Sequence, residues 1–107
     1  MQEKLIFFVL LTCGIILEVV GDVFFKKWSL NSRTVLLVIG AGLYFIGTIF
    51  WAFSLKYETL SKAGTIFMIA NVILIGLAGL FIFKENLSWT NKIGILIGIV
   101  SIILIEL

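Results

Sequence analysis

The sequence lacks proline and histidine altogether, and it contains a single cysteine, Cys13, among its 107 residues. Without proline, no helix can carry a proline kink. Without histidine, any proton chemistry must rely on carboxyl groups. A single cysteine cannot form an intramolecular disulfide, and its place in an apolar run does not predict a metal site. These absences direct attention to the few acidic residues.

Charged residues are also scarce. They make up 13% of the chain, whereas apolar residues make up 62%, and the mean hydropathy is +1.25. Soluble proteins contain roughly 25% charged residues, and a soluble domain of this length would leave much of its surface in water. The chain is therefore predicted to be an integral protein of the inner or plasma membrane that crosses the bilayer several times.

The basic residues lie at the ends of apolar segments, and the net charge is only +2. This placement suits contacts with lipid headgroups and argues against a nucleic-acid-binding surface. If both termini lie on one side of the membrane, three basic residues share that side and five lie on the other. Because this bias is small, a single orientation and a dual topology both stay open.

Four long apolar stretches account for most of the chain. They cover about residues 5–25, 35–55, 63–83 and 89–105. The first three contain 21 residues each, close to the roughly 20 that a helix needs to cross a hydrocarbon core. Continuous apolar runs favour helices over the alternating strands of a membrane barrel, and the short breaks make consecutive helices antiparallel neighbours. We predict an all-α membrane protein with four transmembrane helices in a single domain, residues 1–107.

The first apolar stretch contains two acidic residues, Glu18 and Asp22. A carboxylate deep in a membrane helix is costly, so it marks a functional site by default. Glu18 lies about 4–5 Å from the middle of the stretch at 1.5 Å per residue, and no basic residue lies one helical turn from it. Such a carboxyl group, beside a second acid, is suited to binding a proton or a cation.

Asp22 has two interpretations, because Lys26 follows it by one helical turn. The two side chains could form a structural pair, with the Lys26 ammonium group reaching the headgroups. Alternatively, Asp22 could share a binding site with Glu18. Gly14 and Gly21 thin the helix near the acids, which would let another backbone or a ligand approach.

Further candidate residues lie in the other stretches. Tyr44 could hold an organic cation against its ring. Asn71 is expected either to hydrogen-bond between helices or to line the binding site. Gly94, Gly98 and Ser101 form a small-residue pattern that predicts a dimer interface. The sequence shows no metal-ligand cluster, nucleophile–base pair or phosphate-binding loop, so we expect neither an enzyme nor a cofactor or metal site.

The first helix resembles that of the small multidrug resistance family, within the drug/metabolite transporter superfamily, in the stretch Leu17-Glu-Val-Val-Gly-Asp-Val-Phe-Phe-Lys26. The closing loop and last helix of the superfamily are similar to Phe83-Lys-Glu-Asn-Leu-Ser88 and Ile93-Gly-Ile-Leu-Ile-Gly98. The resemblance implies an antiparallel homodimer of dual topology that is held together by its fourth helices. It also implies that the glutamates of both copies bind protons and a cationic substrate in turn.

The resemblance assigns roles to individual residues. It implies that Glu18 is the shared proton and substrate site. Tyr44 falls at a tyrosine position of the second helix, and Phe67 falls where family members carry a tryptophan. Gly94 and Ser101 fall at small contact positions of the fourth helix.

The chain departs from the family pattern mainly in its third helix. Thr59 occupies the position of a proline, and Gly64 replaces a tyrosine. Ile69 and Asn71 stand where two glycines would be. Asp22 adds an acid where ordinary members have a small polar residue. These departures indicate a divergent member.

The function expected from these residues is proton-coupled export of small cationic or amine-bearing compounds, with protons and substrate competing for Glu18. A second interpretation is a flippase or carrier half for a lipid-linked or neutral metabolite, which needs no central acid and could act as half of a heterodimer. A third is a membrane assembly subunit without transport activity, in which Glu18 would pair with a basic residue of a partner. The expected partners are the lipid bilayer, protons, a small cationic substrate and a second copy of the chain.

Overall fold

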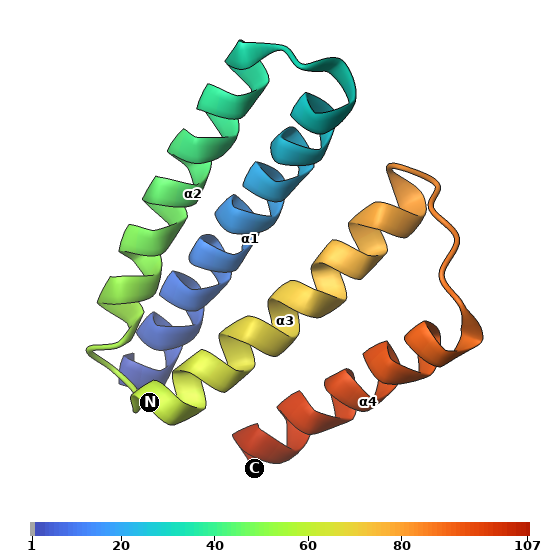
Figure 1. Ribbon diagram of the computed structural model, residues 1–107. Coiled ribbons are helices and arrows are strands. Elements are labelled where there is room, and N and C mark those ends of the chain that lie inside the picture. The colour runs from blue at the N-terminus through green and yellow to red at the C-terminus, as the bar shows by residue number, and fades with distance from the viewer. Residues whose placement is uncertain (1) are drawn as a thin grey trace. The chain divides into compact units, whose positions relative to one another are not determined.

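The computed structural model describes residues 2–107, which form four helices and, within that range, no strand (Figure 1). The helices are α1 (Gln2–Asn31), α2 (Thr34–Ser54), α3 (Leu60–Phe81) and α4 (Trp89–Glu106). All four are long and apolar enough to cross a membrane. The predicted all-α fold with four transmembrane helices is thus confirmed.

Helix α1 is longer than its predicted apolar stretch. It has 30 residues, which correspond to about 45 Å at 1.5 Å per residue. Its ends therefore extend past a hydrocarbon core of about 30 Å. The added turns contain the polar residues Glu3 and Lys4 at one end and Lys26 and Lys27 at the other. The apolar stretch therefore predicts only the part of the helix that spans the hydrocarbon core.

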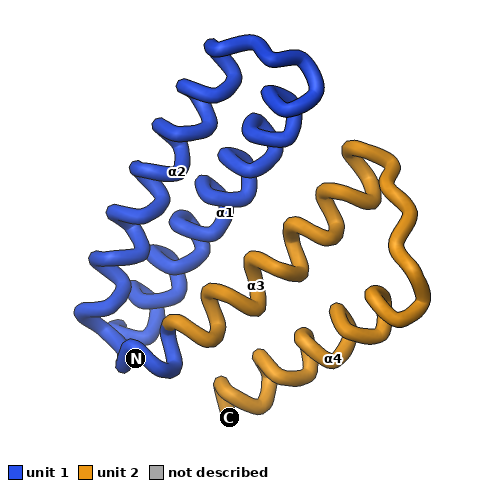
Figure 2. The backbone as a smooth tube through the Cα atoms, in the orientation of Figure 1, with its two compact units in different colours: residues 1–63 blue, residues 64–107 orange. Residues whose placement is uncertain are grey.

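The chain divides into two compact units, residues 1–63 and residues 64–107 (Figure 2). The boundary falls in the first turn of α3. The first unit is built on the hairpin of α1 and α2, and the second is built on α3 and α4. The expectation of a single domain over residues 1–107 stays a prediction.

Two residues, Ser32 and Arg33, separate α1 from α2. Ser32 takes a left-handed backbone conformation with a φ of 57°, and its N–H donates to the Trp28 carbonyl at 2.6 Å. Arg33 is extended, with a φ of −85° and a ψ of 117°. This short reversal makes α1 and α2 antiparallel, and they pack side by side (Figure 1).

Paired glycines bring the backbones of α1 and α2 close together. A Cβ built at Gly21 would lie 3.0 Å from the Gly40 carbonyl oxygen, and one built at Gly40 would lie 3.0 Å from the Gly21 oxygen. Further along the hairpin, a Cβ built at Gly47 would lie 3.0 Å from the Gly14 oxygen. In each helix the two glycines lie two turns apart, at about 3.6 residues per turn. Glu18 lies on α1 between these two close contacts.

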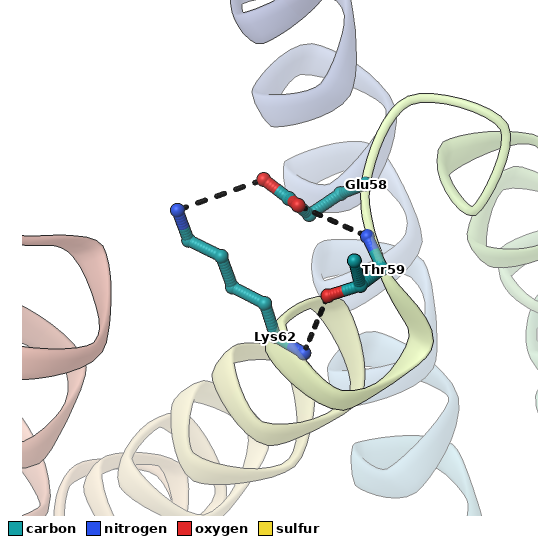
Figure 3. A network of polar contacts seen from close by, with 3 residues as sticks. All are labelled: Glu58, Thr59 and Lys62. Atoms are coloured by element: carbon teal, nitrogen blue, oxygen red, sulfur yellow. Dashed lines mark hydrogen bonds and ion pairs between the residues drawn. The ribbon is translucent and has the colours of Figure 1, made fainter.

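Helix α3 begins with a polar cap (Figure 3). The Lys62 N–H donates to Thr59 Oγ1 at 3.3 Å, and the Thr59 N–H donates to Glu58 Oε1 at 3.0 Å. Lys62 Nζ lies 3.6 Å from Glu58 Oε2. Thr59, at the position of the family's proline, therefore provides an N-cap hydroxyl that a proline side chain lacks.

A loop joins α3 to α4 in the second unit. Lys84 turns the chain with a φ of 52°, and the Ser88 hydroxyl oxygen caps α4 by accepting from the Asn91 N–H at 3.2 Å. A Cβ built at Gly76 of α3 would lie 2.9 Å from Ile95 Cδ1 of α4, so the two helices meet there through one large side chain. No residue of α4 is buried, which leaves most of its surface open within the described chain.

Candidate functional site

Glu18 lies on the face of α1 that packs against α2. Its side chain is only 7% exposed, and a Cβ built at Gly47 of α2 would lie 2.9 Å from Glu18 Cγ. Because Gly47 has no side chain, there is room for the acid between the two helices. The Glu18 side chain is therefore held inside the α1–α2 hairpin.

Tyr44 of α2 connects the two acids of α1. Its hydroxyl lies within hydrogen-bonding reach of the carboxyl groups of both Glu18 and Asp22. Its ring packs against Phe25 of α1, with 5.6 Å between the ring centroids and an interplanar angle of 36°. A Cβ built at Gly21 would lie 3.0 Å from Tyr44 Cδ2. The ring thus contacts α1 at two places, and these contacts position the hydroxyl near both acids.

Asp22 keeps an unused hydrogen-bond acceptor. Its Oδ2 atom is buried, and among the described residues it has no hydrogen-bond partner. Leaving a buried acceptor unpaired costs about 1–3 kcal/mol, and more for a charged group. Asp22 therefore contacts Tyr44 while one of its oxygen atoms stays available, and its predicted pair with Lys26 stays a prediction.

Two carboxyl groups and a phenol hydroxyl thus come together between α1 and α2. Ionised carboxylates only accept hydrogen bonds, whereas an ammonium group donates three. The cluster can therefore bind either protons or one ammonium group. Within residues 2–107, no group of three His, Cys, Asp or Glu side chains is placed to hold a metal ion.

The candidate residues of the third helix, Phe67 and Asn71, lie in the second unit. Phe67 is buried, and its carbonyl accepts from Asn71 Nδ2 at 3.1 Å. Asn71 Oδ1 is buried and has no hydrogen-bond partner within the described chain. The roles of Phe67 and Asn71 in a site with Glu18 stay predictions.

The predicted interface residues of α4 differ in their surroundings. A Cβ built at Gly98 would lie 3.4 Å from Ile69 Cγ2 of α3, whereas one built at Gly94 would meet nothing within 4 Å. The Ser101 hydroxyl donates to the Ile97 carbonyl of its own helix at 3.0 Å. Gly98 therefore serves packing inside the second unit. A dimer interface at Gly94, Gly98 and Ser101 stays a prediction.

Gly40 and Gly47 border the candidate site, although neither was singled out from the sequence. Both lie against α1, and Gly47 contacts Glu18. Their spacing in α2 equals that of Gly14 and Gly21 in α1. In an antiparallel hairpin with a very short turn, equal spacings allow such glycines to meet in pairs. The equal spacing is therefore the sequence feature that could have identified Gly40 and Gly47.

Four membrane helices with acidic side chains buried between two of them are typical of small membrane transporters. Comparison with known proteins agrees, because residues 3–107 match the EamA-like transporter family. The chain belongs to this family. The resemblance to the drug/metabolite transporter superfamily is thus confirmed, and so is the multi-pass location in the inner membrane.

The chain is also similar to a protein of Hamiltonella defensa subsp. Acyrthosiphon pisum (strain 5AT) that is named "Probable 4-amino-4-deoxy-L-arabinose-phosphoundecaprenol flippase subunit ArnE". The two proteins are 33% identical over 108 residues, which cover 94% of this chain and 91% of the relative. No solved structure gives a significant match. Membership of a transporter family supports transport rather than catalysis.

Proposed function

We propose that the chain is one subunit of a membrane transporter that moves a lipid-linked, amine-bearing metabolite from one face of the bilayer to the other. The relative from Hamiltonella defensa supports the lipid-linked class, since its name describes a flippase subunit for an amino sugar joined to phosphoundecaprenol. Two expectations from the sequence are combined here. One is a flippase for a lipid-linked metabolite, and the other is transport of an amine-bearing compound.

The observation that carries the proposal is the position of the Tyr44 hydroxyl beside both Glu18 and Asp22. An aliphatic amine is protonated at neutral pH, as the lysine side chain is, so it would donate hydrogen bonds to both carboxylates and to the phenol oxygen. The unpaired Oδ2 atom of Asp22 is an acceptor for one of these bonds. Charge-assisted hydrogen bonds are roughly twice as strong as neutral ones, which favours an amine over a neutral sugar.

Protons would compete with the amine for the same carboxyl groups. A buried carboxylate without a counter-charge is costly, so the empty site would take up protons and the loaded site would hold the ammonium group instead. If the site opens to one side of the membrane at a time, this competition couples substrate movement to the proton gradient. Glu18 is central to the coupling because it is the deeper and more buried acid.

The chain is proposed to act with a partner. Helix α4 has no buried residue, and the relative is named as a subunit. The partner is either a second copy in the antiparallel, dual-topology arrangement or a related chain in a heterodimer. Co-purification of two differently tagged copies of the chain distinguishes these arrangements.

Proton-coupled export of a small soluble amine is the second candidate function. The same cluster of Glu18, Asp22 and Tyr44 favours it, because the site recognises an ammonium group and not the lipid. Flux of a panel of small amines through the purified protein separates the two candidates. We expect little flux of these amines compared with the lipid-linked substrate.

Proteoliposomes that hold a lipid-linked amino sugar in both leaflets test the proposed function. A membrane-impermeant amine-reactive reagent labels only the outer leaflet, so movement of the lipid raises the labelled fraction above about half. Unlabelled amino lipid in excess should compete, whereas the same lipid with an acetylated, neutral amine should not. Equal competition by the acetylated lipid would show that the amine is not recognised and would overturn the proposal.

A further inference from the structure

An open groove runs between α3 and α4 within the second unit. Its larger hollow has a volume of about 540 Å³ and its smaller hollow about 210 Å³. Val72 of α3 and Gly94 and Ile95 of α4 line both hollows, so the two hollows adjoin each other between the helices. Gly94 leaves the junction open, since a Cβ built there would meet nothing within 4 Å.

The groove is polar at one end and apolar along the rest. Thr90 and Asn91, in the first turn of α4, line the larger hollow. Lys92 lies next to them, with its Nζ 5.1 Å from the centroid of the Trp89 ring. The smaller hollow is otherwise lined by Met68, Ile69, Ile73 and Gly98. Trp and Lys residues are typical of the membrane interface, so the groove starts at headgroup level and continues into the hydrocarbon layer.

We propose that this groove holds the polyprenyl chain of the lipid-linked substrate and that Thr90, Asn91 and Lys92 bind its phosphate. The inference rests on the proposed function, which supplies the lipid-linked class of the substrate. The groove has the polarity of such a lipid, with donors and a positive charge at the interface followed by apolar surface. The Thr90 hydroxyl and the Asn91 amide donate to phosphate oxygens, and the Lys92 ammonium group adds a charge-assisted bond.

The narrow, apolar half of the groove favours a single hydrocarbon chain over a helix from another protein. One helical turn with its side chains, about 10 Å wide and 5.4 Å high, fills on the order of 400 Å³. The larger hollow, at about 540 Å³, has room for such a turn, but the smaller hollow holds only about 210 Å³, so a helix does not fit along the whole groove. Water does not fill the smaller hollow well, because its apolar walls offer few hydrogen-bond partners. A two-chain phospholipid would leave one chain outside the groove, whereas a polyprenyl phosphate places its one chain inside.

The test is the binding of undecaprenyl phosphate, which carries no amino sugar, to the full-length protein in detergent, measured by native mass spectrometry. Gly94→Leu fills the junction of the two hollows, and leucine favours a helix more than glycine does. Gly42→Leu is the matched control, because a Cβ at Gly42 of α2 also meets nothing within 4 Å. We expect at least a tenfold loss of binding for Gly94→Leu, a several-fold loss for Lys92→Gln and no loss for Gly42→Leu.

Three results would overturn the inference. The first is parental affinity of Gly94→Leu for undecaprenyl phosphate. The second is displacement of the probe by phosphatidic acid at equal concentration, which would make the groove a general lipid site. The third is dissociation of a dimer by Gly94→Leu while the lipid still binds, which would assign the groove to a second copy. Because the probe lacks an amine, a failure of the site at Glu18 does not alter this measurement, and the two proposals fail separately.

Discussion

Gly47 of α2 lies directly against Glu18 of α1, and a Cβ built at Gly47 would come within 2.9 Å of Glu18 Cγ. The same Cβ would lie 3.0 Å from the Gly14 carbonyl oxygen. The helices also approach closely at Gly21 and Gly40, so close contacts flank Glu18 on both sides along α1. The position of the buried acid therefore depends on a residue of the neighbouring helix that has no side chain.

Gly47→Ala should displace Glu18 and weaken the α1–α2 hairpin. The added methyl group would overlap Glu18 Cγ and the Gly14 oxygen, and forcing extra atoms into a packed contact costs about 1–3 kcal/mol. Thermal unfolding in detergent and the transport assay measure both effects. Gly42→Ala is the control, since its Cβ meets nothing within 4 Å and alanine favours a helix by about 1 kcal/mol over glycine. Equal behaviour of the two variants would contradict this account of the contact.

Tyr44→Phe should weaken binding of the amine while the fold is kept. The ring contact with Phe25 survives, but the hydroxyl near the two acids is lost. A hydrogen bond to a charged group contributes about 1.5–3 kcal/mol, so affinity should fall by roughly 10- to 100-fold. Tyr57→Phe serves as the control because Tyr57 is exposed. Unchanged affinity in Tyr44→Phe, measured by titration of the lipid-linked amine, would remove Tyr44 from the site.

The two interpretations of Asp22 separate through a pair of variants. If Asp22 binds the amine, Asp22→Asn should lower amine affinity roughly tenfold or more, in line with the loss of a charged hydrogen bond of about 1.5–3 kcal/mol. Lys26→Gln should then leave affinity close to that of the parent. If Asp22 only pairs with Lys26, both variants should have similar small effects on affinity, and Asp22 would have no part in binding.

The cap of α3 should contribute more to stability than the ion pair beside it. Thr59→Ala removes the hydroxyl that accepts from the Lys62 N–H, and loss of an N-cap costs about 0.5–2 kcal/mol. Glu58→Gln removes a partly exposed ion pair with Lys62, which contributes about 0–1 kcal/mol. Unfolding in mixed micelles with increasing denaturing detergent compares the two variants. A larger loss for Glu58→Gln would reverse this order.

The helices and their approximate bounds could be predicted from the sequence, because the bilayer sets the length of an apolar run. The depth of Glu18 in its helix likewise predicted burial. Tyr44 was identified for its aromatic ring, whereas the structure gives its hydroxyl the contacts with Glu18 and Asp22. The hydropathy pattern does not predict these contacts of the hydroxyl, because α2 has apolar residues on all its faces. The glycines of α2 determine which face packs against α1.

Gly94 and Gly98 illustrate the same limit in the second unit. Their spacing predicts a helix contact, and Gly98 does approach Ile69 of α3. Gly94, one turn away, instead opens onto a groove. A pattern of small residues indicates where two helices can approach closely. The large side chains nearby, such as Ile95, determine where the helices do so.

Transport by Glu18→Gln, compared with Glu3→Gln, tests the central claim most directly. Glutamine keeps nearly the shape of the Glu18 side chain but carries no charge and no proton to exchange, whereas Glu3 is an exposed acid in the first turn of α1. The measurement is the fraction of lipid-linked amino sugar that becomes accessible to the impermeant amine reagent in proteoliposomes under a pH gradient. We expect Glu18→Gln to fall to the level of empty liposomes and Glu3→Gln to match the parent. Transport by Glu18→Gln at the parental rate would contradict the assignment of Glu18 as the shared site for protons and amine.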